Sequence, residues 1–568
     1  MTNYQFTGGT ICAPATIPGT GAISIIRVSG KESLAIADKV IDTKGVPIAE
    51  TEGYRLRYGT VFEADGSVLD NVIVSVFRAP HSYTGENSVE ISCHASRFIV
   101  NKILELLVNA GARIAAPGEF TRRAFVNGKM DLAQAEAVAD VIASQSAASH
   151  RVAMNQLKGG FSSELKVLRE KLLTMTSLLE LELDFSEEDV EFASRKELGQ
   201  LVDDSLTHIG RLTASFSRGN AIKNGVPVAI VGATNTGKST LLNALLGEER
   251  AIVSDIAGTT RDTIEETLNI DGILFRFIDT AGIRETDETI EKIGIDRTFK
   301  KLGEAAVVLG MTDLSRGEAA VLEDADFILS KVNEMGGVKN DGTENDGYET
   351  GGASLAGTSG APLSGTDGAS LAETGGSSLA ETGGKPLAET GGASQHGHGD
   401  GQERKVVILV NKCDVAGDFY RDDNGTVYGS GNDLGENMAE IGGNKNINHD
   451  NNIVSLIENK YDNCKVIPIS AKTGKGLSTL TKTLGEIGSE ITGSTDETLV
   501  TNVRHYEALV RAASALERVR AGLHIATLPP DLIAQDLREA LYHLGEIVGE
   551  ITTDETLGNI FRNFCIGK

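Results

Sequence analysis

We expect a multidomain fold of class α/β plus α+β, because the sequence changes pattern three times along its 568 residues. Short β-rich runs and one apolar helix occupy residues 1–120. Helix-period patterns occupy 121–220 and return in 493–568. Between them, in 221–492, strands alternate with helices, as they do around a parallel sheet covered on both faces. The sequence therefore predicts an N-terminal α+β domain and a helical domain in two parts, with an α/β domain inserted between these parts.

The first two regions are distinguished by their periodicity. The N-terminal region contains three runs of strand character, AISIIRVSG, NVIVSVFRA and SVEISCHA, and one helix-period run, FIVNKILELLVNAG. In the helical region, apolar residues recur at three- and four-residue steps, as the helices of a bundle require. These steps predict three helices, at about 132–159, 162–185 and 196–216.

Composition narrows the classes of function. The formal net charge of -27 disfavours broad binding to phosphate backbones but leaves room for a local basic patch. The five cysteines form no CxxC pair, so each is expected to be a buried reduced thiol in a reducing compartment. The N-terminus lacks the pattern of a signal peptide, and no apolar run is long enough to span a bilayer. We therefore expect a cytoplasmic protein that does not contact membranes.

Two polar insertions interrupt the α/β region. Residues 336–403 repeat LAETGG at 371, 379 and 387 among Gly, Ser, Thr and Ala. Their few apolar residues cannot offset the entropy of ordering, so disorder is expected. A repeat solenoid is the competing interpretation, and the lack of recurring bulky residues argues against it. Residues 416–452 form the second insertion.

A phosphate-binding loop is indicated at the start of the α/β region. The apolar run VPVAIVG leads into GATNTGKST at 232–240, and the helical pattern LLNALLG follows. The pattern G-x-x-x-x-G-K-[ST] can arise by chance in a glycine-rich chain, but this strand–loop–helix context is the one that a P-loop needs. We expect Lys238 to bridge the β- and γ-phosphates of a nucleotide and Ser239 to bind Mg²⁺. The contact set of this loop is Asn235, Thr236, Gly237, Lys238, Ser239 and Thr240.

A second motif, DTAG, follows the apolar run LFRFI. Asp279 is then placed to hold the Mg²⁺ shell, and the amide of Gly282 to contact the γ-phosphate. Between the two motifs lies IVSDIAGTTRD, in which Thr260 is expected to join Ser239 on Mg²⁺ when the γ-phosphate is present. The nucleotide contacts expected here are Ser254, Asp255, Ile256, Ala257, Gly258, Thr259, Thr260, Asp279, Thr280, Ala281 and Gly282.

Two further motifs specify the base. In KVVILVNKCD, Asn411 and Asp414 can hydrogen-bond a purine, with Asp414 accepting from the N1–H and the 2-amino group that adenine lacks. Lys412 can lie along the ring. In VIPISAK, the amides of Ser470 and Ala471 can contact guanine O6, with Lys472 beside them. Four motifs in this order, each at the end of an apolar run, predict a Ras-like P-loop G domain that binds and hydrolyses GTP.

The expected catalytic residues include Lys238 and Thr260, but one familiar group is missing. Ile283 follows DTAG at the place where Ras-like proteins have a glutamine. An apolar side chain cannot orient the attacking water, so another group must do so.

At this point the chain resembles the MnmE (TrmE) family of tRNA modification GTPases. TICAPATIPGTGAISIIRVSG resembles the family's N-terminal opening, and PGEFTRRAFVNGKMDLAQAEAVADVI its junction into the helical domain. FCIGK, at 564–568, resembles its C-terminal C-[ILV]-G-K motif. The resemblance covers most of the chain outside the two insertions.

This resemblance implies a potassium ion in place of an arginine finger. Its ligands would come from Asn235, Ser254, Ile256 and Thr259. Glu291 matches the glutamate that acts on the nucleophilic water through a bridging water. From the residues alone, Glu291 would be an exposed helix carboxylate.

The resemblance further implies an N-terminal folate-binding domain that also forms a homodimer. Arg27, Glu90, Lys129 and Lys568 match its contacts to a reduced folate of the 5-formyl or methylene type. A carboxylate suits the pterin's N3–H and 2-amino edge, and cations suit the glutamate tail. For Arg27, a structural ion pair is the alternative. For Cys565, a redox role and a packed thiol both stay open.

In the family, a FAD-containing partner (MnmG, or GidA) and the GTPase together modify C5 of the wobble uridine of certain tRNAs. The alternative is a regulatory or ribosome-assembly GTPase with the same G domain. That class usually carries a basic RNA-binding domain, and it would leave FCIGK unexplained. A folate-binding protein with a vestigial G domain conflicts with the intact Lys238, Ser239 and Asp279.

The chain departs from the family pattern in three respects. Ala233 and Thr234 stand where a basic residue and a proline are usual, and Gly310 stands where a bulky apolar residue is usual. The third departure is the pair of insertions, which flank the run that ends in NKCD.

Overall fold

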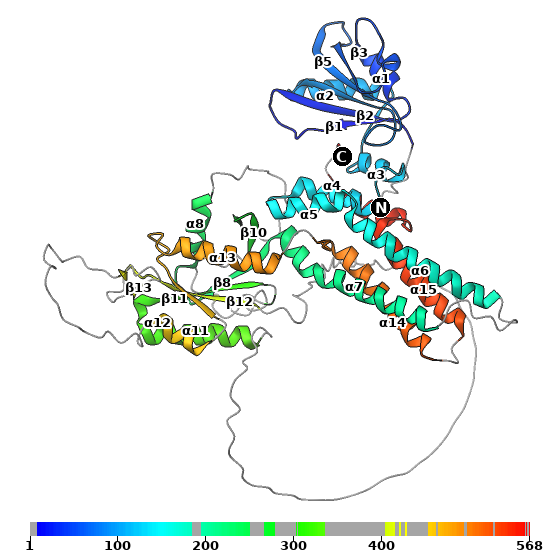
Figure 1. Ribbon diagram of the computed structural model, residues 1–568. Helices are drawn as coiled ribbons and strands as arrows, with labels where there is room; N and C mark the ends of the chain where they lie inside the picture. Colours follow the sequence, from blue (N-terminus) through cyan, green and yellow to red (C-terminus); the bar gives the residue numbers. More distant parts are fainter. Residues whose placement is uncertain are drawn as a thin grey trace, which may run out of the picture.

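The predicted fold class is confirmed by the computed structural model, in which two sheet domains flank a helical one (Figure 1). The structure describes residues 8–184, 195–249, 266–278, 303, 305–334, 404–414, 420–421, 427–428, 453–461, 464–493, 497–525, 529–562, 564 and 567. No helix in these ranges is long and apolar enough to cross a membrane.

The N-terminal domain is a seven-stranded sheet in the order β3-β4-β5-β6-β2-β1-β7. All neighbours are antiparallel except β1 and β7. Apolar residues alternate along the strands, and Val72, Val74 and Val76 of β5 join the core under the helices α1 and α2. The strands are β1 Ile11–Pro14, β2 Ile23–Ser29, β3 Ile41–Asp42, β4 Arg55–Phe62, β5 Val68–Phe77, β6 Ser88–His94 and β7 Arg113–Ile114. The helices are α1 Ser33–Val40, the 3-10 turn η1 Ile48–Glu50, α2 Arg97–Asn109 and α3 Glu119–Val126.

The helical domain is built from two separated parts of the chain. One apolar core contains residues from α6 and α7 together with residues from α14 and α15, so neither part can bury its apolar face alone. The first part comprises α4 Leu132–Ala143, α5 Ala147–Leu157, α6 Gly160–Asp184 and α7 Arg195–Asn224. The second comprises α14 Val503–Leu523, α15 Pro530–Val548 and α16 Asp554–Arg562.

The prediction of one helix over 132–159 is wrong, because α4 and α5 are separate helices. Ser146 begins α5: its hydroxyl accepts from the Ser149 amide, and the Ser149 side chain returns to the Ser146 amide. Such a reciprocal cap starts a new helix, and it competes with continuation of the preceding one. The helix-period pattern crosses this break without a change, which is why periodicity alone missed it.

A buried charged cluster joins the two parts of the helical domain. The carboxylate of Glu136, on α4, accepts from Arg504 Nε at 2.9 Å and contacts His505 Nε2 at 2.6 Å, both on α14. Arg504 also donates to the Glu546 and Ile547 carbonyls of α15. Burial alone would raise the pKa of Glu136, but the neighbouring His505 and Arg504 lower it to about 2.

The inserted domain is a doubly wound sheet in the order β15-β12-β11-β8-β10-β9, parallel except for β9. α8 and α13 pack on one face, α11 and α12 on the other. The strands are β8 Val226–Gly232, β9 Glu266–Ile270, β10 Ile273–Ile278, β11 Val307–Asp313, β12 Lys405–Asn411 and β15 Cys464–Pro468. The helices are α8 Lys238–Glu249, the 3-10 turn η2 Leu314–Arg316, α11 Glu318–Glu334, α12 Ile453–Lys460 and α13 Leu477–Thr492.

Two departures from the family pattern lie in this domain. At Gly310 on β11, the side chains of Ile408 and Ile328 fill the space that a larger residue would occupy, since a Cβ there would lie 2.7 Å from Ile408 Cδ1 and 3.1 Å from Ile328 Cγ2. Within the second insertion, β13 Tyr420–Arg421 pairs with β14 Val427–Tyr428. The first insertion, 336–403, and the rest of the second lie outside the described residues.

Glu136→Gln should lower the free energy of unfolding of the helical domain by about 3 kcal/mol at neutral pH, because Arg504 would lose its buried counter-charge. The folded pKa of Glu136, about 2, lies below its ordinary 4.5, so the wild type's advantage is complete above pH 4.5 and is lost as the pH falls towards 2. Denaturant unfolding followed by circular dichroism, from neutral pH down to about pH 3, measures this difference. The control is Glu180→Gln, which breaks an exposed pair with Arg538 and should cost about 0.5 kcal/mol or less. Equal losses in the two variants would contradict the structural importance of the cluster.

Candidate nucleotide-binding site

The loop between β8 and α8 has the conformation that its glycines permit. Gly237 has φ +99°, and a Cβ at this residue would lie 2.3 Å from Asn411 Nδ2. Gly232 approaches the next strand as closely, since its Cβ would lie 2.3 Å from the Met311 carbonyl oxygen. Asn235, at the exposed tip, adopts φ +62°. The loop therefore turns tightly at the carboxyl edge of the sheet and delivers the chain into the first turn of α8.

Lys238 and Thr236 fold back onto this loop. Lys238 Nζ donates to the Gly232 and Ala233 carbonyls at 2.9 and 2.8 Å, and burial lowers its pKa. The buried Thr236 hydroxyl donates to the Ala233 carbonyl at 2.9 Å. Ser239 follows in the first turn of α8, where backbone amides and a helix dipole favour an anion. The ammonium group is thus held at the loop by weak acceptors that phosphate oxygens can replace.

Asn411 connects the P-loop to the loop after β15. Its buried side chain donates from Nδ2 to the Thr236 carbonyl at 2.7 Å and accepts the Ala471 amide on Oδ1 at 3.0 Å. Two loops from strands far apart in sequence are therefore joined by one side-chain amide. Within the described residues, the second N–H of that amide makes no hydrogen bond, so it can serve a ligand.

Lys412 makes a contact that the sequence did not predict. Its backbone has φ +65°, and its Nζ pairs with Asp313 Oδ2 at 2.6 Å, at the end of β11. Burial would raise the pKa of Asp313, but hydrogen bonds from Lys412 and Ser315 lower it. The sequence could have pointed to Asp313, because this residue ends the apolar run VVLGMTD just as Asn411 ends the run KVVILVN. Asp414 follows two residues after Lys412, partly exposed.

The amides expected to face guanine O6 already have partners in this structure. The Ser470 amide donates to the Lys475 carbonyl at 3.0 Å, and the Ala471 amide to Asn411. Within the part of the chain that the structure describes, the amide of the exposed Lys472 makes no hydrogen bond. The loop thus offers Lys472 as a further donor for a base carbonyl.

Part of the expected site lies outside the described residues, including the whole of the expected switch region and Glu291. These residues are Ser254, Asp255, Ile256, Ala257, Gly258, Thr259, Thr260, Asp279, Thr280, Ala281, Gly282 and Glu291.

A second group of predicted site residues meets on the N-terminal sheet. Arg27 on β2 and Glu90 on β6 are register partners, and Arg27 Nη2 lies 2.8 Å from Glu90 Oε1. The Arg27 guanidinium also lies over the Tyr83 and Phe120 rings, at 5.1 and 5.6 Å from their centroids. The ion pair that was the alternative for Arg27 is therefore present.

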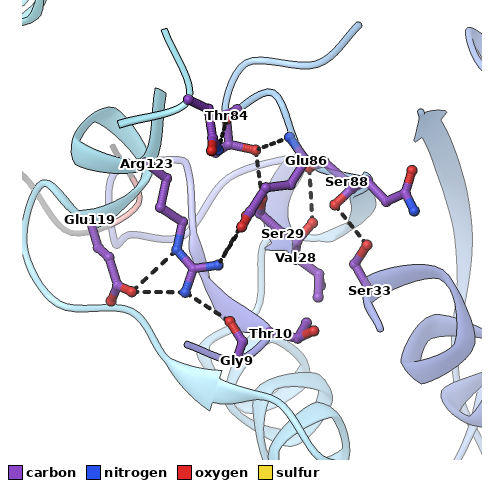
Figure 2. Close-up of polar contacts among 12 residues, drawn as sticks. Gly9, Thr10, Val28, Ser29, Ser33, Thr84, Glu86, Ser88, Glu119 and Arg123 are labelled. Atoms are coloured by element: carbon purple, nitrogen blue, oxygen red, sulfur yellow. Dashed lines mark hydrogen bonds and ion pairs between the residues drawn. The ribbon is translucent and has the colours of Figure 1, made fainter. Parts of the chain in front are cut away.

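The loop that carries Tyr83 is held in place by a buried polar network around Glu86 and Arg123 (Figure 2). Arg123, 2% exposed, pairs with Glu86 at 2.9 Å and with Glu119 at 3.0 Å. Figure 2 shows the same Glu86 carboxylate accepting from the Ser29 hydroxyl, at 2.9 Å. These contacts fix the 82–87 loop to β2 and α3, so the loop is rigid where it meets Arg27.

The C-terminal motif reaches this group as well. Gly567 accepts from Arg27 Nη1 at 3.4 Å, and a Cβ on Gly567 would lie 2.0 Å from the Pro14 carbonyl oxygen. Lys129 donates to the Pro80 carbonyl at 3.1 Å and packs beside Gly85. Lys568 and Cys565 lie outside the described residues.

Comparison with known proteins places the whole chain in one family. The family model for the GTP-binding protein TrmE N-terminus matches residues 10–129, and the model for the MnmE helical domain matches 132–565. A tRNA modification GTPase MnmE of Parabacteroides distasonis is 43% identical over 562 residues, covering 98% of this chain and 100% of that protein. Similar proteins of Bacteroides thetaiotaomicron and Porphyromonas gingivalis are 42% and 41% identical, covering 98% and 100% of this chain and 99% of each relative. The chain belongs to the MnmE family of tRNA modification GTPases.

Membership in the MnmE family confirms the predicted enzyme class, a GTP hydrolase of tRNA modification. The helical-domain match runs across the inserted sheet domain, in agreement with the shared core of α6, α7, α14 and α15. In this chain the described cysteines are free and buried, and burial raises the pKa of each thiol to about 11. They are Cys12, Cys93, Cys413 and Cys464.

Asn411→Ala should weaken nucleotide binding, because both loops that it joins would lose a buried hydrogen bond. Two such bonds are worth about 2–3 kcal/mol, so GDP affinity should fall roughly 30- to 150-fold. Titration with a fluorescent GDP analogue measures the change. The matched control is Asn243→Ala, at an exposed position of α8 in the same domain. An unchanged affinity in Asn411→Ala would show that the two loops hold their positions without the amide.

Proposed function

We propose that this protein is a K⁺-dependent GTPase that, with a FAD-containing partner of the MnmG type, modifies C5 of the wobble uridine of certain tRNAs, using a reduced folate as one-carbon donor. The observation that carries the GTPase part is the Asn411 amide, which brings the P-loop and the 470–472 loop together at the carboxyl edge of one parallel sheet. Family membership and the matching residues support the remaining parts. We assign nucleotide chemistry to 221–492, folate binding to 1–120, and the connection between them to 121–220 and 493–568.

The described residues suit GTP as a substrate. The amides of the P-loop surround the β-phosphate, and Lys238 exchanges its two carbonyl partners for β- and γ-phosphate oxygens. The second Nδ2 proton of Asn411 is available to the base, and Asp414 accepts from the guanine N1–H and 2-amino group. Lys412, anchored to Asp313, lies along the ring.

The proposed metal ions complete this site. Mg²⁺ would be held by Ser239 and Thr260, with Asp279 in its outer shell, and K⁺ by Asn235, Ser254, Ile256 and Thr259. Asn235 and Ser239, in the phosphate-binding loop, carry oxygen donors that fit such hard cations. When bound, the two ions neutralise charge that develops on the β- and γ-phosphates. Glu291 would orient the water that attacks the γ-phosphorus, through a second water.

The N-terminal group suits a reduced folate. Glu90 uses only Oε1 for Arg27, so in the described part of the chain its other oxygen is open to the pterin's N3–H and 2-amino groups. The Tyr83 and Phe120 rings give Arg27 an apolar support. We assign Lys129 and Lys568 to the carboxylates of the glutamate tail. The bound folate would supply the one-carbon unit.

An apolar surface of the same sheet supports a homodimer. Leu56, Tyr58 and Ile73 lie on the face of β4 and β5 that the helices leave uncovered, and they are 66%, 67% and 47% exposed. Tyr58 and Ile73 are register partners, so they form one continuous patch. We propose that a second copy of this chain covers it.

GTP turnover should fall at least tenfold when K⁺ is replaced by Na⁺ at equal ionic strength, because the smaller ion fits the proposed oxygen cage poorly. Phosphate release at saturating GTP measures the rate. GDP affinity, measured in parallel, should differ little between the two salts. Equal turnover in K⁺ and Na⁺ would remove the potassium assignment.

The tRNA of cells that lack this protein should lose the C5 modification of the wobble uridine. Mass spectrometry of nucleosides from purified tRNA measures the loss, and restoring the wild-type chain should reverse it. Lys238→Ala, which removes the phosphate contact, should fail to restore it. An unaltered wobble uridine in the deletion strain would leave the regulatory or ribosome-assembly GTPase as the better function.

A further inference from the structure

A polar cavity opens where the inserted domain meets the helical domain. The β9–β10 hairpin reaches the start of α5, where Asn269 Nδ2 donates to the Gln145 carbonyl at 3.1 Å and the Ala148 amide donates to the Gly272 carbonyl at 3.4 Å. Figure 1 shows α5 close to β10, near one edge of the inserted sheet. The cavity next to these contacts measures about 820 Å³. It is lined by Ser144, Gln145, Ser146, Ala147, His150, Arg151, Met154, Asn155, Lys158 and Asn269.

The charge of this lining is opposite to that of the chain. His150, Arg151 and Lys158 line it, and none of its described lining residues is a carboxylate, although the chain carries a formal net charge of -27. The comparable cavity on the N-terminal domain, of about 910 Å³, mixes Lys39 and Lys44 with three carboxylates. The basic side chains of this cavity attract an anion, whereas the acidic surface elsewhere on the protein repels it.

The basic residues form a stripe along one helix. Arg151 and Asn155 on α5 and Lys158, which caps the C-terminus of that helix, follow one another at four- and three-residue steps, so they lie on one side of the helix. Arg151 and Lys158 are seven residues apart, which is about 10 Å along the helix axis. Successive phosphates of one strand can contact both side chains at once. Both side chains are exposed.

We propose that this cavity binds the backbone of the RNA substrate. Arg151 and Lys158 would contact phosphates, and the amide side chains of Gln145, Asn155 and Asn269 offer donors and acceptors to ribose hydroxyls or bases. The inference rests on the proposed function, since it assumes a tRNA substrate. Because Asn269 belongs to the inserted domain and α5 to the helical domain, RNA bound here contacts both domains at once.

The double charge reversal Arg151→Glu/Lys158→Glu tests the site in the full-length chain. Its affinity for an unmodified tRNA transcript with a uridine at the wobble position, measured by fluorescence anisotropy at several salt concentrations, should fall at least tenfold. The slope of log affinity against log salt should decrease by about two, one for each phosphate that the variant no longer binds. The matched control is Lys166→Glu/Lys171→Glu, which makes the same charge change at exposed positions of α6, outside the cavity. The control should keep the affinity and the slope of the wild type.

Each outcome decides the inference. Equal losses in the two double variants would reduce the effect to overall charge and overturn it, as would unchanged binding in the cavity variant. If the cavity variant binds RNA as the wild type does but no longer captures the FAD-containing partner, the cavity binds an acidic protein segment, and the RNA proposal is wrong. If the double charge reversal lowers the thermal unfolding midpoint, the neutral variant Arg151→Gln/Lys158→Gln is tested instead. The slope of log affinity against log salt should change by the same amount. A wild-type chain that does not bind the transcript overturns the site by itself, and the nucleoside analysis then decides separately whether the proposed function stands.

Discussion

The pairing of Glu136 with Arg504 and His505 closes a domain whose two parts are separated by the whole inserted sheet. In the same domain, α14 and α15 cover the apolar faces of α6 and α7. The inserted domain is consequently attached at both of its ends, through α7 into β8 and through α13 towards α14. An attachment at two points restricts how the inserted domain can move, because any rotation must be shared between both connections. The contact of the β9–β10 hairpin with α5 adds a third point.

This arrangement gives each proposed activity its own rigid support. The nucleotide loops lie at the carboxyl edge of the inserted sheet, where parallel strands bring together residues from distant parts of the sequence. Arg27 and Glu90, two of the folate candidates, lie on a different sheet, next to the loop that the Arg123 network fixes. The helical domain lies between these sheets along the chain and in space (Figure 1). Within the described residues, the helical domain therefore connects the inserted domain to the N-terminal domain.

How much the sequence predicted depends on how local each feature is. The P-loop was predictable because a strand, a glycine-rich turn and a helix are contiguous, and the ends of β12 and β15 because polar residues follow apolar runs. The break at Ser146 was missed, because a serine cap leaves the apolar spacing of the surrounding residues unchanged. The pairing of Lys412 with Asp313, and the use of Asn411 to join two loops, depend on which strands are neighbours in the sheet. Strand order is not encoded within any single motif. The cavity beside α5 could not be predicted either, because Asn269 reaches it from a hairpin that is distant in the sequence.

The contact of Gly567 with Arg27 and Pro14 bears on how the molecule is made. Arg27 and Gly567 are separated by 540 positions, and Glu136 and Arg504 by 368. At about 5–20 residues per second, the ribosome needs roughly 30–110 s to reach Gly567 after Arg27. The N-terminal sheet has all its strands within the first 114 residues, so it can fold early in that interval. The first four helices of the helical domain must meanwhile wait for α14 and α15 with their apolar faces uncovered. A nascent chain of this protein therefore passes through a long interval in which it needs protection from aggregation, and chaperone binding during translation should concentrate on α6 and α7.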